Sequence, residues 1–509
     1  MTVRDLSELI DRHAAATPDK AAIRFIGRSL SYAELAQRIE RASRSLQSQL
    51  GVRPGDRVAI LAANHPDYLV LLYACARLGA MLVPVNWRLA VPEQLYILTD
   101  AAVKALIVEQ TFAEVTGPLR TALPGVHVVG LDFEPEGGVR FDALLSGAEG
   151  EGRAPRVSLS SPLLIVYTSG TTGRPKGAVL LQDALVCNAE MSRHLHAMTA
   201  DDHILTVLPM FHVGGLNVQT TPALQLGATV TLHPRFAPGA TLDAIEHDRP
   251  TLTVLVPATI QAVIEQPRWP QARLDSLRAV TTGSTYVPQH LIEALGNRGV
   301  PVLNMYGATE TSPIAIYARL DGDWRRPGSC GLAGSLCEAR VVDDSGREVT
   351  AGTAGEVVMR GRNVFAEYWR KPDATRDALR SGWFHSGDIG SRDAKGYFTI
   401  LERKQNVIIS GGENIYPAEV ERVLLEHPAV AEAAVVGAPD PKWQEVPVAC
   451  IVRRLGTGTE ASEIESFCLR DLARFKVPRR YVFVDALPRN ALGKVQHALL
   501  RQQIAAGGA

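Results

Sequence analysis

Residues 167–177 form a segment whose residue types suit the binding of a polyphosphate. The segment reads YTSGTTGRPKG and holds four Ser or Thr hydroxyls, three glycines and one lysine. Glycines let backbone N–H groups close around an anion, while hydroxyls and a lysine add donors and positive charge. The segment is not a P-loop, because Pro175 stands where that pattern requires its second glycine. A flexible surface loop is the alternative interpretation. The predicted phosphate-binding residues are Thr168, Ser169, Gly170, Thr171, Thr172, Gly173 and Lys176.

Further motifs follow along the chain, and each is a weak signal when taken alone. A histidine beside an apolar run is usually packed in the core, Gly-Asp is usually a turn, and a lysine in a glycine loop is usually solvated. Taken together and in order, the motifs resemble those of the adenylate-forming superfamily of acyl-CoA synthetases, adenylation domains and luciferases, with a pattern closest to bacterial fatty-acid or aryl-acid CoA ligases. The segments that carry the resemblance are YTSGTTGRPKG at 167–177, LPMFH at 208–212, NMYGATE at 304–310, WFHSGD at 383–388, SGGENIYP at 410–417 and PRNALGK at 488–494.

The resemblance implies an ATP and AMP site around residues 304–310. In relatives, the tyrosine that corresponds to Tyr306 stacks on adenine, and the threonine that corresponds to Thr309 binds the α-phosphate. The position of Glu310 is that of a glutamate that helps to bind Mg²⁺, and Gly307 belongs to the same element. A flat aromatic ring, a hydroxyl and a hard carboxylate are suited to these three roles.

The same resemblance implies ribose-binding and catalytic residues. Asp388 and Arg403 would hold the ribose, since a carboxylate can accept hydrogen bonds from both ribose hydroxyls. Lys494 would be the catalytic lysine of adenylation, because its charge on a mobile stem can meet the negative charge that develops at the α-phosphate. His212 and Glu310 complete the predicted catalytic set.

The resemblance also implies which residues bind the acid and CoA. The residues predicted to line the acyl pocket are His212, Val213, Gly283 and Tyr286. The residues predicted to serve the CoA or thioester step are Gly411, Gly412 and Glu413. A small-molecule carboxylic acid would react with ATP to give an acyl adenylate and pyrophosphate, with Mg²⁺ at Glu310, Lys176 and Lys494 neutralising charge. After rotation of a small C-terminal domain, the thiol of CoA would attack the adenylate.

The elements that must position these residues alternate between helix and strand. Leu35, Ile39 and Leu46 lie on one helical face, which follows Ser31 and Glu34 in the arrangement of a capping box. The strands expected in this part are 56–62, 80–84, 104–108, 163–167, 204–208, 229–232 and 253–256. Such alternation predicts an α/β fold with a large N-terminal domain of parallel sheets covered by helices.

The pattern changes after about residue 325 and again after Leu401. Short strands at 338–342, 355–360 and 396–400 indicate a small β-rich subdomain. The last part of the chain is expected to have the order β-turn-α-β-β-α-β and to form a small mobile α+β domain. The predicted boundaries are 1–402 for the ATP- and acid-binding domain, 403–406 for a hinge and 407–509 for the C-terminal domain.

The composition argues against several other classes of protein. The net charge of −1 lacks the basic excess of a nucleic-acid-binding protein. The six cysteines show no CxxC spacing and are expected to be buried thiols. The apolar stretch 69–85 contains Arg77, so we expect a buried helix that runs into a strand and no integral membrane segment. The N-terminus lacks a secretory pattern, which favours a cytoplasmic location. Assembly as a homodimer is left open.

The identity of the acid is less determined than the chemistry. Residues 213–218 are small and apolar, and no arginine is evidently placed to receive a second carboxylate. A medium- or long-chain fatty acid is the first expectation, and an aryl acid such as a benzoate or cinnamate is the alternative. Two departures from the family pattern bear on this scheme: Tyr286 stands at the border of the pocket, and Gln405 stands at the hinge where relatives often have Asp or Lys.

Several rival functions are open at this point. The main rival is an acyl-AMP ligase that loads a carrier protein, although no carrier domain follows Lys494. Luciferase-like oxygenation is another. A phosphotransferase that uses residues 171–176 would need a second phosphate-acceptor site, and a nucleotide sensor would be expected to lack Lys494 or Glu310. Acid-dependent release of pyrophosphate, measured with and without CoA, separates these functions.

Overall fold

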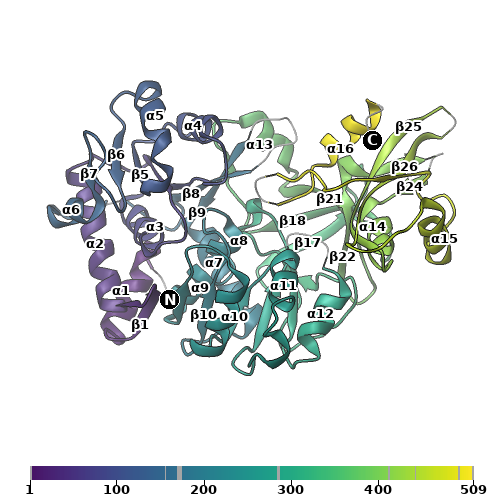
Figure 1. Cartoon of the computed structure of the whole chain (residues 1–509). Helices are drawn as coiled ribbons and strands as arrows, with labels where there is room; N and C mark the ends of the chain where they lie inside the picture. Colours follow the sequence, from purple (N-terminus) through teal and green to yellow (C-terminus); the bar gives the residue numbers. More distant parts are fainter. Residues whose placement is uncertain are drawn as a thin grey trace. The chain divides into compact units, whose positions relative to one another are not determined.

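The computed structural model of this 509-residue chain describes residues 3–154, 156–168, 175–283, 287–410, 413–441, 443–490 and 493–506. The chain forms two compact units. The first consists of Met1–Ala339 and Met359–His385, and the second of Arg340–Val358 and Ser386–Ala509 (Figure 1). The domain boundaries proposed above, with a hinge at 403–406, stay a prediction.

An eight-stranded sheet is one of the two large sheets of the first unit. Its order is β19-β9-β8-β4-β3-β5-β6-β7; the β19-β9 and β9-β8 pairs are antiparallel and the others are parallel. The strands are β3 (Arg57–Leu61), β4 (Met81–Pro84), β5 (Ala105–Val108), β6 (His127–Gly130), β7 (Val139–Arg140), β8 (Pro162–Thr168), β9 (Lys176–Leu181) and β19 (Glu367–Tyr368).

The other large sheet of the first unit has nine strands, in the order β16-β15-β14-β13-β12-β10-β11-β1-β2. The run from β14 to β1 is parallel, and the pairs at both edges are antiparallel. The strands are β1 (Ala21–Phe25), β2 (Arg28–Ser31), β10 (His203–Thr206), β11 (Thr229–Leu232), β12 (Leu252–Val254), β13 (Ala279–Thr282), β14 (Val302–Tyr306), β15 (Ile316–Tyr317) and β16 (Leu332–Ala333).

Helices connect most of the parallel strands of both sheets, as the alternating pattern predicts. The predicted capping box is present at the start of α2, where the Glu34 N–H donates to Ser31 Oγ at 3.2 Å and the Ser31 N–H donates to Glu34 Oε2 at 2.7 Å. The helices are α1 (Ser7–Ala16), α2 (Tyr32–Ser48), α3 (Pro66–Leu78), α4 (Val91–Asp100), α5 (Thr116–Ala122), α6 (Phe141–Ser146), α7 (Gln182–His196), α8 (Val213–Asn217), α9 (Thr220–Leu226), α10 (Pro238–His247), α11 (Pro257–Ile264), α12 (Gln289–Gly296) and α13 (Pro372–Ala378), with short 3₁₀ helices η1 (Gln110–Val115), η2 (Trp269–Gln271) and η3 (Thr309–Thr311).

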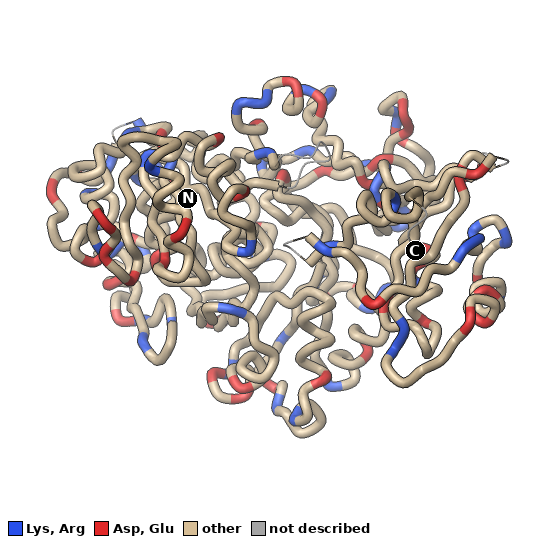
Figure 2. Tube along the Cα trace, turned by 45° about the horizontal axis from the view of Figure 1, so that its top comes forward, with Lys and Arg blue, Asp and Glu red and all other residues tan. Residues whose placement is uncertain are grey.

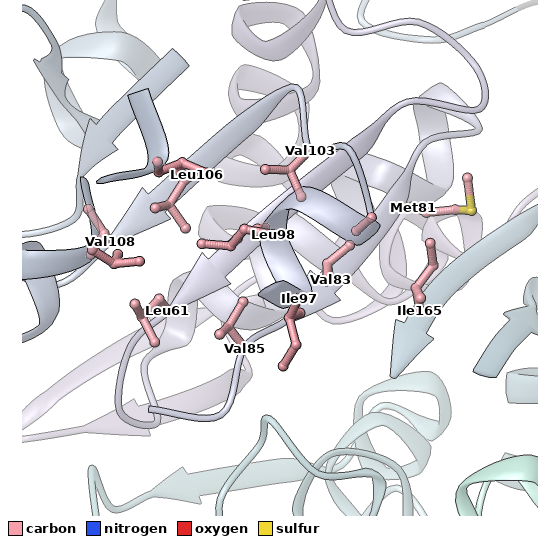
Figure 3. Close-up of a cluster of buried hydrophobic side chains, with 14 of the residues drawn as sticks. Leu61, Met81, Val83, Val85, Ile97, Leu98, Val103, Leu106, Val108 and Ile165 are labelled. Carbon is pink, nitrogen blue, oxygen red and sulfur yellow. The ribbon is translucent and has the colours of Figure 1, made fainter. Parts of the chain in front are cut away.

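One core cluster of the first unit lies between helix α4 and the eight-stranded sheet. Figure 3 shows Ile97 and Leu98 of α4 among side chains of the strands, including Leu61 and Leu106. The strands β4 and β5 are buried along their whole length, because both faces of a parallel sheet are covered. Burying one aliphatic side chain of this size contributes about 1.5–3 kcal/mol, so the cluster is a major source of the unit's stability.

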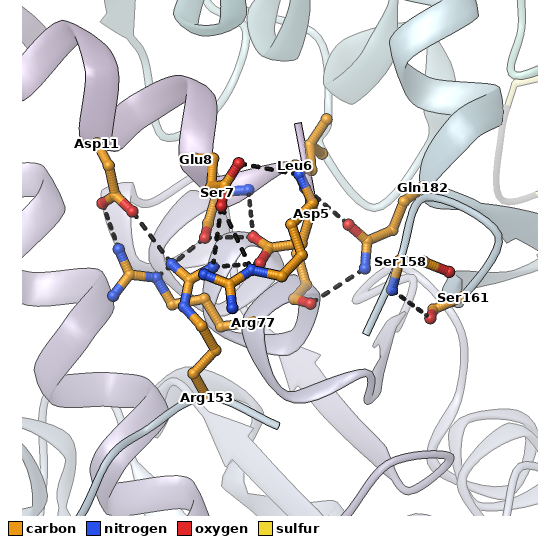
Figure 4. Close-up of polar contacts among 12 residues, drawn as sticks. Asp5, Leu6, Ser7, Glu8, Asp11, Arg77, Arg153, Ser158, Ser161 and Gln182 are labelled. Atoms are coloured by element: carbon orange, nitrogen blue, oxygen red, sulfur yellow. Dashed lines mark hydrogen bonds and ion pairs between the residues drawn. The ribbon is translucent and has the colours of Figure 1, made fainter. Parts of the chain in front are cut away.

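Arg77 interrupts the apolar sequence of helix α3, and the structure shows why a charge is tolerated there. All residues of α3 are buried, and the Arg77 side chain pairs with Asp11 and donates to Ser7 Oγ at 3.0 Å (Figure 4). Arg153 pairs with Asp5 and lies 3.2 Å from Asp11. Buried charges are found where they are paired in this way. The expectation of a buried helix followed by a strand is therefore confirmed, and no helix of the described residues is long and apolar enough to span a bilayer.

A third sheet of the described residues has five strands. Its order is β17-β18-β21-β20, and β22 also pairs with β21. The strands are β17 (Cys337–Val342), β18 (Gly355–Gly361), β20 (Leu379–Arg380), β21 (Trp383–Arg392) and β22 (Phe398–Arg403). The predicted short strands of this region are thus present. They are followed by η4 (Lys404–Asn406).

The last part of the second unit contains more elements than its sequence pattern indicates. In chain order they are β23 (Ile408–Ser410), β24 (Glu413–Ile415), α14 (Pro417–Leu425), β25 (Val430–Asp440), β26 (Gln444–Arg453), α15 (Ala461–Asp471), β27 (Arg480–Phe483) and α16 (His497–Ala505). The predicted order missed β24 and α16. β24 has only three residues, two of them exposed, and α16 has only Leu500 and Ile504 as buried residues, so neither has a strong periodicity.

The distribution of charged residues and the burial of the cysteines agree with the expectations from the sequence. Figure 2 shows Lys and Arg interspersed with Asp and Glu along the chain. All six cysteines are free and buried. Burial raises the pKa of the Cys187 and Cys468 thiols to about 11, which makes them poor nucleophiles at neutral pH.

Candidate functional site

Three of the predicted site residues lie at or shortly after the carboxyl ends of strands of the nine-stranded sheet. His212 comes six residues after β10, Gly283 comes directly after β13, and Tyr306 is the last residue of β14. These strands are parallel and lie in the order β14-β13-β12-β10. Since the carboxyl ends of parallel strands meet at the same edge of a sheet, the topology gathers the three residues where α/β proteins bind ligands.

Two glycines allow backbone segments to approach one another closely at this edge. A Cβ atom at Gly283 would lie 2.5 Å from the Met305 carbonyl oxygen, and one at Gly307 would lie 1.7 Å from the Pro313 carbonyl oxygen. Both contacts are with backbone, which cannot move aside as a flexible side chain can. Only glycine therefore fits at the two positions without a shift of the backbone.

His212 is the N-cap residue of helix α8. Its Nδ1 atom accepts a hydrogen bond from the Gly214 N–H at 3.0 Å, so the proton of the neutral ring lies on Nε2. The following residue, Val213, is buried. The histidine is half-buried. The capping bond to Nδ1 fixes the orientation of the ring, and the N–H group at Nε2 is a donor of the kind that can bind a carboxylate.

Glu310 is connected to the end of the phosphate segment through a residue that the sequence did not single out. Thr309 and Glu310 are each only 8% exposed in η3, and the Tyr368 hydroxyl donates to Glu310 Oε1 at 2.7 Å. The Lys176 ammonium lies 5.4 Å from the centre of the Tyr368 ring. β19 pairs with β9, with Tyr368 opposite Ala178, and this pairing brings the three side chains together.

Asn363 is a second residue that the sequence analysis missed. It is completely buried, and its Nδ2 group donates to the carbonyl oxygens of Thr311 at 3.2 Å and Ile314 at 2.8 Å. The backbone carbonyl oxygen of Asn363 accepts a hydrogen bond from the Ser312 hydroxyl at 2.8 Å. These bonds hold the turn that follows Glu310, in which the Ser312–Pro313 bond is cis. An asparagine 53 residues from Glu310 has no local pattern that could reveal such a role.

The phosphate segment itself is described only at its ends. Thr168 and Lys176 are opposite each other in the antiparallel β8-β9 pair, and Thr168 Oγ1 donates to the Lys176 carbonyl oxygen at 3.5 Å. The apolar run after the segment is therefore a strand that returns alongside the first. The predicted phosphate-binding residues Ser169, Gly170, Thr171, Thr172 and Gly173 and the predicted pocket residue Tyr286 lie outside the described residues.

The two predicted ribose-binding residues lie together in the second unit. Asp388 of β21 is opposite Arg403 of β22, and Arg403 Nε lies 2.8 Å from Asp388 Oδ1. The Asp388 N–H donates to Ser386 Oγ at 3.0 Å, and the Ser386 hydroxyl donates to the Val357 carbonyl oxygen at 2.6 Å. Gly387 between them has a φ of 69°, a conformation that favours glycine. This pairing places a carboxylate and a guanidinium side by side.

Residues of the predicted hinge are bonded to the part of the second unit that follows them. Arg501 donates to the carbonyl oxygens of Gln405 at 3.0 Å and Asn406 at 3.1 Å. The carboxylate of Glu402 accepts from the Asn406 side chain at 3.1 Å and from the Ala418 N–H at 3.1 Å. Burial raises the pKa of Glu402 above its usual value, and the nearby Glu421 carboxylate raises it further.

Lys494 lies in a tight loop of the second unit. The Lys494 N–H donates to Asn490 Oδ1 at 3.0 Å, and the Asn490 N–H donates to the Lys494 carbonyl oxygen at 2.9 Å. Arg489 donates to the Gly493 carbonyl oxygen at 2.7 Å and pairs with Glu432 at 2.7 Å. The backbone that carries Lys494 is therefore held firmly. Of the predicted thioester residues, Glu413 is the exposed first residue of β24, while Gly411 and Gly412 lie outside the described residues.

Comparison with known proteins covers nearly the whole chain. Residues 10–369 match the family described as AMP-binding enzyme, and residues 419–494 match the AMP-binding enzyme C-terminal domain. The chain is 50% identical over 502 residues to the indoleacetate–CoA ligase of Aromatoleum aromaticum, with 98% of each chain covered. It is 39% identical over 492 residues to a feruloyl-CoA synthase of Amycolatopsis sp, with 97% of each chain covered.

Two more similarities bear on substrate and fold. A long-chain-fatty-acid–CoA ligase of Mycobacterium tuberculosis is 34% identical over 481 residues, which cover 94% of this chain and 93% of that protein. The crystal structure of an anthranilate CoA ligase in complex with anthranoyl-AMP has a TM-score of 0.91 at 27% identity, with 99% of this chain and 98% of that chain covered. The predicted fold class, a large parallel-rich α/β domain followed by a smaller C-terminal domain, is confirmed.

Proposed function

Because the chain belongs to the family of AMP-binding enzymes and is an AMP-forming acid–thiol ligase, we propose that it activates an aromatic carboxylic acid with ATP and transfers the acyl group to CoA. The observation that carries this choice of acid is the 50% identity to an indoleacetate–CoA ligase over 98% of both chains. The fatty acid that the sequence alone favoured becomes the second candidate, because the fatty-acid ligase compared above is 34% identical.

The residue types at the sheet edge support an apolar acid with one carboxylate, a class that includes the aromatic acids. The segments 211–218, 281–283 and 302–307 contain no Lys, Arg, Asp or Glu. Phe211 and Val213 are buried, and the glycines at 214, 215 and 283 keep side-chain volume small there. An acid that binds at this edge would meet apolar groups and the His212 N–H donor, and none of these segments offers a partner for a second carboxylate.

Glu310 is the residue that would hold Mg²⁺. A hard carboxylate suits this cation, which usually takes one or two protein carboxylates together with phosphate oxygens and water. The Tyr368 hydroxyl occupies only Oε1, and no ion pair involves Glu310 among the described residues. No cluster of three or more acidic, His or Cys ligands occurs in the described part of the chain, which fits a cation shared with ATP. When bound, Mg²⁺ would neutralise phosphate charge.

The other residues would bind and orient the two reacting groups. Tyr306 would stack on adenine, Thr309 would donate to the α-phosphate, and Asp388 with Arg403 would hold the ribose. The carboxylate of the acid, oriented by His212, attacks the α-phosphorus, and the bond from this phosphorus to the bridging oxygen breaks with its electron pair leaving on pyrophosphate. Lys494 would stabilise the charge that develops at the α-phosphate.

The second half-reaction is transfer of the acyl group to the thiol of CoA. We assign Glu413 and the neighbouring Gly411 and Gly412 to this step, together with a rotation of the C-terminal domain at residues 403–406. A cytoplasmic location is part of the same proposal, since CoA and ATP are supplied there. Whether the enzyme acts as a homodimer is a separate expectation.

The experiment that tests the proposal measures pyrophosphate release with a panel of acids, with and without CoA. The panel contains indole-3-acetate, ferulate, benzoate, octanoate and palmitate. We expect kcat/KM for an aromatic acid to exceed that for both fatty acids by at least about tenfold, which corresponds to about 1.4 kcal/mol of transition-state stabilisation. Preference for palmitate would favour the second candidate. Acyl-AMP that forms without subsequent transfer to CoA would indicate a carrier protein as acceptor, and no acid-dependent pyrophosphate would refute the ligase function.

A further inference from the structure

A pocket of about 560 Å³ in the first unit adjoins the described end of the phosphate segment. Its lining includes Lys176 at the start of β9, Tyr368 of β19, and Arg370 and Lys371 in the turn between β19 and α13. None of the motifs singled out in the sequence contains Arg370 or Lys371, and neither has a role in the function proposed above.

Backbone pairing places these two cations beside Lys176. The Trp369 N–H donates to the Gly177 carbonyl oxygen at 2.7 Å, which continues the β19-β9 pairing to the residue before Arg370. The chain then turns sharply, with Arg370 at a φ of 51° and the Lys371 N–H donating to the Tyr368 carbonyl oxygen at 3.0 Å. A left-handed conformation is uncommon for an arginine and directs its side chain away from the path of an extended strand.

Thr375 holds this turn in place. Its hydroxyl donates to the Lys371 carbonyl oxygen at 2.9 Å and accepts from the Tyr368 N–H at 2.9 Å. The Trp369 indole N–H donates to the Asp100 carbonyl oxygen at 3.1 Å, which fixes the turn to the end of α4. These bonds therefore fix the backbone that carries both residues.

The side chains that line the pocket carry a net positive charge. Lys176, Arg370 and Lys371 are its cations, and Asp373 and Asp377 are its acids. Asp373 is paired with Arg376 at 2.5 Å, and Lys371 is only at the outer limit of an ion pair, 3.9 Å from Asp100. Arg370 lies 5.2 Å from the centre of the Trp369 ring, so its planar guanidinium is held over an aromatic face. An arginine and two lysines around one pocket are the donors that proteins use for phosphate groups.

We propose that Arg370 and Lys371 bind the terminal diphosphate of ATP and then hold it as the pyrophosphate leaving group, so that the pocket is a pyrophosphate site continuous with Lys176. This inference depends on the proposed function, because it requires cleavage between the α- and β-phosphates. In that step the new bond joins the carboxylate oxygen to the α-phosphorus, and the electron pair of the broken bond stays on pyrophosphate. Cations placed at the leaving group stabilise the charge that it gains.

The test uses the full-length enzyme with Arg370→Gln, Lys371→Gln and the double variant. Arg249→Gln is the matched control, because it removes an exposed arginine of the first unit that pairs with Asp275, and neither of these residues lines the pocket. Two quantities are measured: the dissociation constant of inorganic pyrophosphate in the presence of Mg²⁺ by calorimetry, and the KM for ATP in the acid-dependent reaction. The thermal midpoint of each variant and its rate of acyl transfer from preformed acyl-AMP to CoA are recorded as checks on folding and on the second half-reaction.

We expect each single variant to raise both constants about tenfold and the double variant to raise them further. Both constants of Arg249→Gln, and the acyl-transfer rates of all variants, should stay within about twofold of those of the parent enzyme. Restoration of pyrophosphate binding by Lys371→Arg would support a charge-based role. Unchanged pyrophosphate binding in the folded double variant, or an equal loss in Arg249→Gln, would overturn the inference. Failure of the parent enzyme to release pyrophosphate with any acid would instead refute the proposed function.

Discussion

Asp388 and Arg403 face one another across the antiparallel strands β21 and β22, with 2.8 Å between Arg403 Nε and Asp388 Oδ1. The Asp388 side chain is 8% exposed and that of Arg403 is 50% exposed. The arginine therefore covers the carboxylate on one side and holds it in one orientation. This relationship connects two residues that are 15 positions apart in the sequence and that the family resemblance assigned to the ribose.

We predict that Asp388→Asn raises the KM for ATP about 10- to 100-fold. Hydrogen bonds to a charged group contribute about 1.5–3 kcal/mol, and the amide cannot accept from two ribose hydroxyls as strongly as the carboxylate. The measurement is the KM for ATP in the pyrophosphate-release assay. Arg392→Gln serves as control, because Arg392 also lies on β21 but pairs with Glu348. An unchanged KM in Asp388→Asn would contradict the ribose assignment.

Substitution of Lys494 separates the two half-reactions. Lys494→Ala is expected to lower the rate of adenylation at least about 100-fold, as is typical when a group that stabilises developing charge is removed. Formation of the thioester from preformed acyl-AMP and CoA should be largely unchanged, because Lys494 is assigned to the first step only. The exposed Lys395→Ala is the control for a general loss of charge. Equal loss of both half-reactions would refute the rotation of the C-terminal domain.

Magnesium dependence tests the link between Tyr368 and Glu310. Tyr368→Phe removes the hydroxyl that donates to Glu310 Oε1. Loss of a group that orients a metal-binding carboxylate commonly weakens metal affinity 10- to 100-fold, so we expect a rise of at least about tenfold in the Mg²⁺ concentration that gives half-maximal activity. Chelation with EDTA should abolish pyrophosphate release, and added Mg²⁺ should restore it. A lower kcat at an unchanged Mg²⁺ requirement would show that Tyr368 does not act through the metal.

Acid is expected to destabilise the first unit through His196. Its ring is completely buried and bonded to Thr281 at 2.7 Å and to Gln219 at 2.9 Å, and burial lowers its pKa to about 4. Because the unfolded chain binds this proton near pH 6.5 and the folded chain does not, the stabilising effect is full above pH 6.5 and is lost as the pH falls towards 4. The loss over that range is about 3 kcal/mol.

Chemical unfolding at pH 7.5, 6.0 and 5.0 measures this effect. In His196→Gln the amide has no proton to gain, so the free energy of unfolding should be lower at pH 7.5 but should fall less steeply between pH 6.5 and 5.0 than in the parent enzyme. Replacing the exposed His247 by Gln leaves this slope unchanged if His196 is its source. Parallel slopes in the parent and in His196→Gln would contradict the assignment.

Much of the fold could be predicted from sequence because it depends on local information, and the reaction class followed from the resemblance of the ordered motifs to a known family. Hydroxyl-, glycine- and lysine-rich segments keep their chemical character in any fold, and helices such as α2 are defined by their capping residues and apolar spacing. The same reasoning failed for β24 and α16, because their few buried residues give no strong periodicity of apolar residues. It also left the acid undecided, since a run of small apolar residues accommodates an alkyl chain and an aromatic ring alike.

The sequence by itself thus determined which chemical groups are present and in what order: the phosphate segment, the Tyr306–Glu310 element, Asp388 and Lys494. Only the tertiary structure decided which residues assist them. Tyr368 reaches Glu310 because β19 pairs with β9 nearly 190 residues away along the chain, and Asn363 holds the turn after Glu310 through backbone carbonyl groups. Arg370 and Lys371 come beside Lys176 through the same strand pairing. Such long-range pairing depends on the packing of whole sheets, which no local pattern records.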